Sequence, residues 1–267
     1  MSAELPDKRV SNPQAHPLPK YQSPLLSQAT IMPEQRSWSG CGVILSFFKV
    51  RESSKVSEEA LYTWFNEEFT PALLATGAVK SATLYKAANP SYDKQQLLLY
   101  NVSDLAAIQA GRLSGVARSS KLSLFEGSID DHVEFEWRIY SFAQLYETAV
   151  HSEEVAPTIL LAMMQPAQGG EAELDAWYRE EHNQQMSEQT GWLRTTRFSL
   201  VGQNSSSGQT SGELSFLAIH AFEQSNQLGN EVQALEPMSD WTKKIMSEAQ
   251  AIDAAIYHKQ KEPAKQH

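Results

Sequence analysis

The stretch 173-ELDAWYREEH-182 is amphipathic, and an earlier stretch, 60-ALYTWFNEEF-69, repeats its pattern. Extended to the next glycine with one gap, the two stretches share six identical positions: Leu61/Leu174, Trp64/Trp177, Glu67/Glu180, Glu68/Glu181, Thr76/Thr190 and Gly77/Gly191. Average residue usage would give about one identity over such a window. The flanking segments agree in character, since an apolar run precedes each stretch. The pattern therefore indicates an internal duplication.

Each half of the chain predicts the same order of elements. A buried strand is followed by an amphipathic helix that ends at a glycine, then by two strands, a second helix and a last strand. In the first half the expected elements are strand 43–48, helix 57–74, strands 79–85 and 97–102, helix 103–111 and strand 133–140. In the second half they are strand 159–164, helix 171–189, strands 193–200 and 214–222, helix 231–251 and strand 254–258. This βαββαβ order is that of the ferredoxin-like unit.

A ferredoxin-like unit has helices on only one face of its sheet, so the other face must be covered. Two tandem copies can cover each other, which predicts an α+β fold in which two tandem ferredoxin-like repeats form an intramolecular dimeric α+β barrel. We expect a Pro-rich arm at 1–38, repeats at 39–152 and 153–260, and a tail at 261–267. The polar stretch 202–212 is expected to be a mobile loop between two strands.

Composition narrows the class of protein. The chain has 267 residues and a formal net charge of −10, so it would repel a phosphate backbone and we expect no nucleic-acid partner. The apolar runs are too short to span a bilayer, and no basic amphipathic stretch suggests a membrane surface. Cys41 is the one cysteine, and we expect it to be a small core residue and not a nucleophile. A cytoplasmic protein is therefore expected.

The second half carries the motif W-Y-x-x-E-H followed by G-W, formed by Trp177, Tyr178, Glu181, His182, Gly191 and Trp192. This motif resembles the helix of dimeric α+β-barrel proteins, and it most resembles the EthD-like branch, which is often met in fungi as a two-repeat chain. The resemblance covers roughly 41–258, although the first half has Phe69 where the motif has histidine. It implies a pocket between helices and sheet that takes small apolar molecules. The branch includes cofactor-free cyclases, decarboxylases and oxygenases acting on polyketide-like substrates, and also proteins with no known activity.

The catalytic candidates are His182, Tyr178 and Glu181. His182 replaces Phe69, which cannot move a proton, so the divergence favours an acid/base role; the alternative is a histidine that caps a loop or contacts water. Glu181 is kept as Glu68 in the first half, which favours a structural carboxylate that accepts backbone N–H groups over an acid of raised pKa. Tyr178 either orients a substrate oxygen or packs in the core, and we expect the core role.

The candidates for substrate binding are Trp177, Trp192, Arg194 and His220. Both tryptophans are expected to pack in the core, with a place in the pocket wall as the alternative for Trp192. Arg194 and Arg197 should point to opposite faces of a strand. One of them could bind a carboxylate or enolate, although solvated surface is the expected place. His220 could face His182 across the pocket, and a satisfied core or surface histidine is the more ordinary interpretation.

Motifs for other chemistries are missing from the sequence. It has no G-x-S-x-G elbow, no nucleotide-binding glycine loop and no histidine spacing typical of a metal site, so we expect no cofactor and no metal.

The resulting hypothesis is a cofactor-independent acid/base enzyme, namely a cyclase, decarboxylase or isomerase, acting on a small apolar polyketide-like metabolite in secondary metabolism. The alternatives are a cofactor-free oxygenase and a non-catalytic small-molecule-binding or stress protein. We expect a monomer with an internal pseudo-dimer, or a homodimer, and we expect the functional pocket in the second half.

Overall fold

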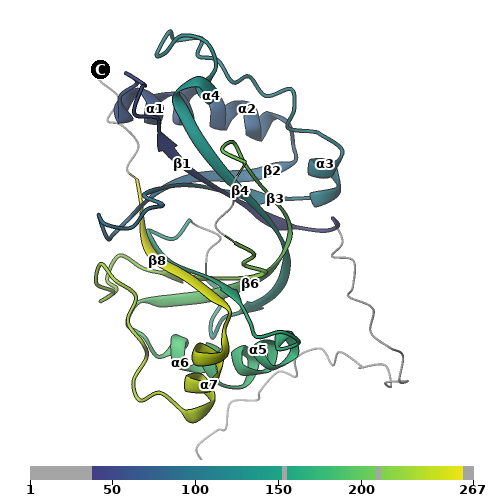
Figure 1. Cartoon of the computed structure of the whole chain (residues 1–267), viewed down its shortest axis with the longest axis vertical. Helices are drawn as coiled ribbons and strands as arrows, with labels where there is room; N and C mark the ends of the chain where they lie inside the picture. The colour runs from purple at the N-terminus through teal and green to yellow at the C-terminus, as the bar shows by residue number, and fades with distance from the viewer. Residues whose placement is uncertain (1–37, 152–154, 209–211, 261–267) are drawn as a thin grey trace, which may run out of the picture. The chain divides into compact units, whose positions relative to one another are not determined.

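The computed structural model describes residues 38–151, 155–208 and 212–260 (Figure 1). The expected arm at 1–38, apart from Trp38, and the expected tail at 261–267 lie outside these segments. Within them, the strands close a barrel in the order β1-β3-β2-β8-β5-β7-β6-β4. The strands are β1 Gly42–Val50, β2 Val79–Ala87, β3 Gln96–Val102, β4 Val133–Tyr146, β5 Thr158–Gln165, β6 Trp192–Ser205, β7 Phe216–Phe222 and β8 Ala251–Lys259.

The strand order confirms the predicted repeats. The first repeat has the order β4-β1-β3-β2 and the second has β8-β5-β7-β6, so each runs fourth, first, third and second strand, all antiparallel. The two sheets join along β4 with β6 and along β2 with β8. The molecule thus has the fold of a dimeric α+β barrel built within one chain, because each sheet uses the other to pair its edge strands and cover its inner face.

The long helix of each repeat follows the first strand. In the first repeat it consists of α1 Glu58–Trp64, a π-helical turn Phe65–Phe69 and α2 Thr70–Ala75. In the second repeat it consists of α5 Glu171–Trp177, a π-helical turn Tyr178–His182 and α6 Asn183–Ser187. Both helices are followed by the predicted glycine, with φ of 72° at Gly77 and 76° at Gly191. Glycine adopts this left-handed conformation without a steric penalty, and Gly77 directly follows the helix cap Thr76. In the second repeat the helix ends earlier, at Ser187, and Gly191 lies in the turn before β6.

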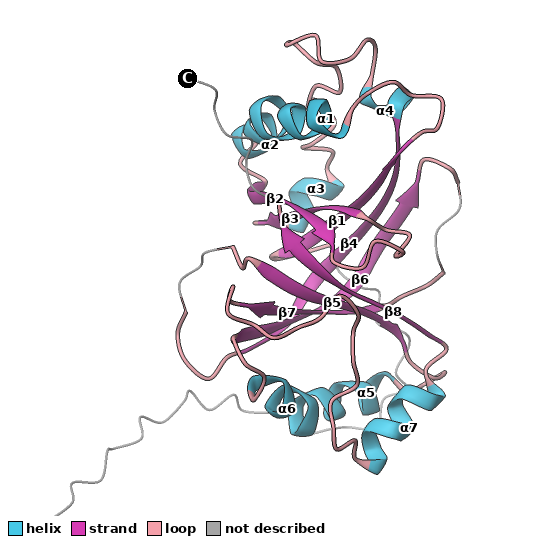
Figure 2. Ribbon diagram, turned by 90° about the vertical axis from the view of Figure 1, so that its left-hand side faces the viewer, coloured by secondary structure: helices cyan, strands magenta, loops and turns pink. Residues whose placement is uncertain are grey.

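Side chains alternate along every strand between two faces. One set fills the barrel interior, with Leu45, Leu97, Leu161 and Tyr257 among its most buried members. The other set faces the helices, which cover the outside of the barrel on two sides (Figure 2). On one side are α1, α2, α3 Leu105–Gln109 and α4 Ile129–His132, and on the other are α5, α6 and α7 Asp240–Glu248.

Three sequence-based expectations are corrected. The second helix of the second repeat is only α7, because residues 223–239 form an irregular loop that includes Pro237. The polar stretch 202–212 begins as strand, since β6 continues to Ser205 by pairing with β4, and residues 209–211 lie outside the described segments. Cys41 is exposed just before β1 and is not a core residue.

Candidate functional site

The site is built around the helix of the second repeat, where Trp177 and Glu181 hold the start of α7. The Trp177 Nε1–H donates to Thr242 Oγ1 at 3.0 Å, and the Thr242 hydroxyl donates to Glu181 Oε1 at 2.7 Å. Ser239, whose side chain caps α7, donates to the same oxygen at 2.6 Å. These hydroxyl hydrogen bonds hold the pKa of Glu181 below its usual value. Glu181 is thus an ionised carboxylate that anchors α7, which opposes its interpretation as an acid of raised pKa.

His182 lies one helical turn after Tyr178 and packs against two aromatic rings. Its ring stacks on Trp177 with centroids 4.2 Å apart and meets the edge of Tyr178 at 5.1 Å. Its Nδ1 is buried and has no hydrogen-bond partner among the described residues. Burial lowers the pKa of His182 to about 4; the charge of Glu181 opposes this shift and that of Arg197 adds to it. The imidazole is therefore neutral at pH 7, with one ring nitrogen unsatisfied.

His220 reaches the same place from β7. The two imidazole centroids are 5.6 Å apart and the rings are nearly perpendicular, at 80°. His220 Nδ1 is 2.8 Å from Thr195 Oγ1, which accepts the Trp192 Nε1–H at 3.2 Å. Thr195 can donate its own proton to His220 Nδ1 while it accepts from Trp192, and this arrangement places the proton of neutral His220 on Nε2. Burial lowers the pKa of His220 well below its ordinary value, so this histidine is also neutral at pH 7.

Tyr178 and Arg197 form a buried pair next to His182, and Arg197 does not line the cavity. The Arg197 guanidinium carbon lies 4.3 Å from the centre of the Tyr178 ring, and Arg197 donates to Asp175 at 2.9 Å and to Gln144 at 2.7 Å. The Tyr178 hydroxyl meets the Met164 sulfur at 3.9 Å, and burial raises the pKa of this tyrosine to about 12. The expectation of a solvated surface is wrong for Arg197, which is 5% exposed.

Two of the expected binding residues lie elsewhere. Burial raises the pKa of Tyr85, a residue of the barrel interior, and the charge of Arg194 opposes the rise, which places Arg194 on the inner side of β6. Trp192 is buried in a cluster beside the cavity and packs against Tyr146, with centroids 5.8 Å apart. Neither Arg194 nor Trp192 lines the cavity, and Glu181 does not line it either. Trp177, Tyr178, His182 and His220 do line it.

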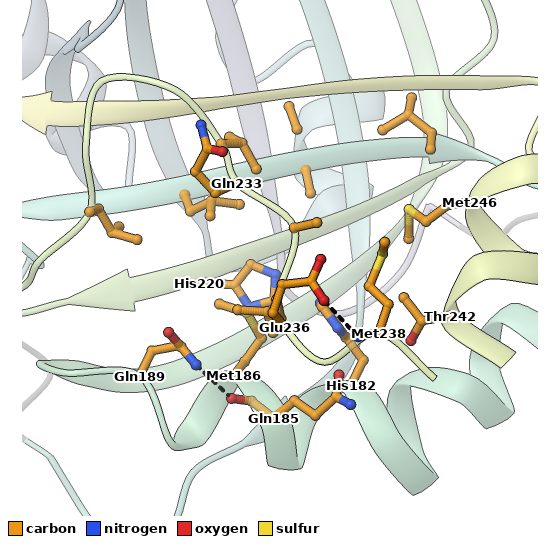
Figure 3. Close-up of a pocket in the computed structure, with 18 of the residues that line it drawn as sticks. His182, Gln185, Met186, Gln189, His220, Gln233, Glu236, Met238, Thr242 and Met246 are labelled. Atoms are coloured by element: carbon orange, nitrogen blue, oxygen red, sulfur yellow. Dashed lines mark hydrogen bonds between the residues drawn. The ribbon is translucent and has the colours of Figure 1, made fainter. Parts of the chain in front are cut away.

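The cavity has a volume of about 450 Å³, within the roughly 300–1,000 Å³ range of small-molecule sites. Its floor comes from β5, β7 and β8, one wall from α5 to α6, and its cover from the loop 227–238 and α7 (Figure 3). Sequence reasoning missed the lining residues Gln185, Gln189, Gln233, Glu236, Met238 and Met246. The first two had a signal, since positions three and seven residues after His182 lie on its side of a helix. Gln233, Glu236, Met238 and Met246 had no such signal, because the sequence predicts one continuous helix over 231–251.

The corresponding space in the first repeat is much smaller. It is a cavity of about 140 Å³ lined by Phe69, Tyr100, Arg118 and five other residues. Strand register makes Tyr100, opposite Ile44, the equivalent of His220, opposite Leu160. The larger of the two corresponding spaces thus lies in the second repeat, and the functional role of this cavity stays a prediction.

The described segments contain no group of three or more His, Cys, Asp or Glu residues placed to hold a metal ion. Among the helices described here, none has both the length and the apolar character needed to cross a membrane.

Comparisons with known proteins support the fold. No family model matches the sequence, and no curated protein matches it. The chain is similar to the solved structure of an anthrone oxidase-like protein, with 12% identity and a TM-score of 0.51 over 85% of this chain and 93% of that chain. A putative monooxygenase from Fusobacterium nucleatum aligns with 10% identity and a TM-score of 0.49 over 84% of this chain and 94% of that chain. A putative monooxygenase from Lactobacillus acidophilus aligns with 9% identity and a TM-score of 0.46 over 82% of this chain and 94% of that chain.

Proposed function

We propose that this protein is a cofactor-independent acid/base enzyme that acts on a small, largely apolar, polyketide-like molecule bound in the second repeat. One observation carries the proposal: two neutral histidines, 5.6 Å apart, meet at a cavity of about 450 Å³, and one has a buried nitrogen without a partner. Unsatisfied buried polar atoms are costly, so they mark places where a ligand group can bind. The resemblance of the W-Y-x-x-E-H segment to EthD-like proteins supports the same reaction class.

In this proposal His182 accepts a proton from a carbon next to a substrate carbonyl. A base of pKa about 4 is weak at neutral pH in the empty cavity. A negative charge developing on the bound substrate raises the pKa of an adjacent imidazole, because opposite charges stabilise each other strongly in an apolar surrounding. Proton acceptance by His182 would therefore be coupled to formation of the enolate, and the same group would return the proton to another atom during cyclisation or isomerisation.

His220 would stabilise the enolate oxygen in this scheme. With Thr195 donating to Nδ1, the proton of His220 lies on Nε2, and this Nε2–H donates a hydrogen bond to the oxygen. A donor that is already oriented needs no reorganisation during the reaction, which is why such donors contribute strongly to catalysis. Tyr178, with its hydroxyl on Met164, supports the histidine by packing and does not take part in proton transfer.

A cofactor-free oxygenase is the second candidate, and it shares the first step. One similar structure is that of an anthrone oxidase-like protein. In such a reaction the carbanion left after proton removal would be oxidised by molecular oxygen. Uptake of oxygen during turnover separates this function from cyclisation, decarboxylation and isomerisation.

Anthrone is a suitable probe, because it is a flat tricyclic ketone with an acidic C–H bond in the central ring. We expect the wild-type protein to accelerate deuterium exchange at that carbon, measured by NMR in D₂O, with an oxygen electrode run in parallel. The His182→Phe variant imitates the first repeat and should keep the fold by circular dichroism. Its exchange rate should fall by about 10²–10⁴-fold, the usual effect of losing a positioned proton-transfer group.

His258→Phe is a matched control, since His258 is an exposed histidine on β8 outside the cavity, and its rate should equal that of the wild type. Exchange by His182→Phe at the wild-type rate would remove His182 from the mechanism. Tight binding of anthrone without exchange or oxygen uptake would contradict the enzymatic proposal and support the alternative of a binding protein.

A further inference from the structure

The charge of the second-repeat cavity limits which molecules it can take, an inference that rests on the proposed function. Among the described residues that line the cavity there are two carboxylates, Glu231 and Glu236, and no lysine or arginine. His182 and His220 are neutral at pH 7. The nearby buried cation, Arg197, lies over the Tyr178 ring and is bound by Asp175 and Gln144, so it does not reach the cavity.

An anionic ligand in this cavity would lose its water without meeting a lysine or arginine, and a histidine could become its positive partner only by taking a proton from water against its lowered pKa. Burying a charge without a countercharge is strongly unfavourable. The cavity instead offers neutral polar groups, since Gln185, Gln189, Gln227 and Gln233 all line it. Their amides can both donate to and accept from hydroxyl and carbonyl groups. The lining is therefore suited to an uncharged molecule with an apolar body and several oxygen substituents.

Glu236 is the carboxylate best placed to act on the ligand. It accepts a hydrogen bond from the Met238 backbone N–H at 3.2 Å, which orients its side chain, and Figure 3 draws it among the residues that line the cavity. Glu231 is bound by Asn89, at 3.3 Å between Asn89 Nδ2 and Glu231 Oε1, and Asn89 does not line the cavity. Both carboxylates are exposed, but only the side chain of Glu236 is oriented by a residue of the cavity lining, Met238.

We infer that the second-repeat cavity takes an uncharged substrate and rejects carboxylates, with Glu236 as the residue that determines this specificity. Rejection by an unpaired like charge is a common way to exclude a near-identical ligand. Within the proposed function, this favours cyclisation, isomerisation or oxygenation of a neutral ketone or phenol. It argues against decarboxylation, because a decarboxylase must first hold the carboxylate that it removes.

Two probes with the same ring system test the inference: 9-anthracenemethanol, which is neutral, and 9-anthracenecarboxylate. Binding of each to the full chain would be measured by isothermal titration calorimetry at pH 7.5. We expect the alcohol to bind at least about tenfold more tightly than the carboxylate. Glu236→Gln keeps the size of the side chain and removes its charge. It should tighten carboxylate binding about three- to tenfold and leave alcohol binding within about twofold.

Glu231→Gln is the matched control, because it removes an equal charge from a side chain that Asn89 binds outside the cavity lining, and it should change the ratio of the two affinities by less than about twofold. Equal affinities for the two probes in the wild type, or tighter binding of the carboxylate, would overturn the inference while leaving a small-molecule site in place. An unchanged ratio in Glu236→Gln would overturn the role of Glu236. Binding of neither probe would overturn the proposed function, and this inference with it.

Discussion

Two aromatic clusters, one in each repeat, have nearly the same geometry and different chemistry. Phe69 stacks on Trp64 with centroids 4.6 Å apart and ring planes at 22°, and His182 stacks on Trp177 at 4.2 Å and 18°. The residue after each tryptophan adds a tilted ring, with centroids 5.1 and 4.9 Å from the indole. A stacked ring at this place is therefore a requirement of packing, and the fold accepts phenyl or imidazole there. Only the imidazole brings a nitrogen that can exchange a proton.

The Trp and Glu that both repeats share, Trp64 with Glu68 and Trp177 with Glu181, bind a different segment in each repeat. Trp64 donates to the Ser119 carbonyl and Glu68 accepts from Ser120 and from two backbone N–H groups, so together they fix the loop 119–122. Arg118, next to that loop, lies over the Phe69 ring at 5.6 Å. In the second repeat the same pair holds α7, and the loop 223–239 arches over the sheet. The space of about 140 Å³ in one repeat thus becomes about 450 Å³ in the other.

The two sheets also differ in the polarity of their helix-facing side chains. Strand register places Ala82 and Leu84 of the first repeat where the second has Thr195 and Arg197. Together with the exchange of Tyr100 for His220, these replacements make the helix-facing side of the second sheet more polar at three positions. The first repeat is packed as a support and the second carries the candidate site.

Replacing the two tryptophans should give the largest effects on stability. Trp64→Ala and Trp177→Ala should each lower the free energy of unfolding by about 3–5 kcal/mol, the usual loss for a large core aromatic. Trp64 should cost more, because Phe65, Phe69 and Phe125 surround it, whereas Trp177 borders an existing cavity. Urea denaturation followed by circular dichroism measures both values. A larger loss for Trp177→Ala would contradict the contrast between a packed and a hollow repeat.

Replacing the two glutamates should have a smaller effect. Glu68→Leu removes the acceptor of two backbone N–H groups, of Lys121 and Leu122, and should cost about 1–3 kcal/mol. Glu181→Leu removes the acceptor of two hydroxyls, which can turn to water, and should cost about 0.5–1.5 kcal/mol. Thermal melts of both variants test the order. Glu181→Leu should also weaken binding of 9-anthracenemethanol because α7 covers the cavity, whereas equal binding by both variants would count against the anchoring role of Glu181.

The smallest expected effect is the change in the free energy of unfolding for each pH unit. The folded pKa of His182, about 4, lies below its ordinary value of 6.5, so the unfolded chain binds more protons between these values. The contribution of His182 is fully present above about pH 6.5 and is lost as pH falls toward 4, by about 1 kcal/mol per pH unit. His220, whose pKa is also lowered, acts in the same direction.

Comparison of the wild type with His182→Phe isolates this contribution. Glu68 and Glu181, whose folded pKa values are lowered from 4.5, are present in both proteins, so their titration cancels when urea denaturation between pH 7 and 5 is compared. The wild type should lose more stability than the variant over this interval, and the variant should retain the share that His220 contributes. Parallel pH profiles for the two proteins would show that His182 is not held neutral by the fold.

Much of the fold follows from local patterns in the sequence. Apolar runs of strand length, helices ended by Gly77 and Gly191, and the matched spacing of Trp64 with Trp177 predict two βαββαβ units, and a sheet with one bare face requires a second sheet. The contrast of Phe69 with His182 is also visible in the sequence, because the repeat itself supplies the comparison. Within each repeat these features depend on residues that are close in the sequence, so the sequence alone determines them.

The remaining parts of the candidate site depend on contacts between distant residues. A bulge in β6 between Trp192 and Arg194 shifts the alternation of faces, so Trp192 and Thr195 lie on the same side while Arg194 turns to the barrel interior. The same bulge occurs in β2 between Val79 and Ser81. Strict alternation would place Trp192 and Arg194 on the same face, and the sequence does not reveal the bulge that separates them.

The meeting of His182 with His220, and the loop 223–239 above them, were decided by tertiary structure alone. His220 faces the cavity because β7 pairs with β5 and β6 in one register, and a shift of one residue would turn it to the other face. That register results from backbone pairing and side-chain packing over the whole barrel. The sequence by itself specified two repeats and one unusual histidine, whereas long-range pairing determined which polar groups this histidine meets.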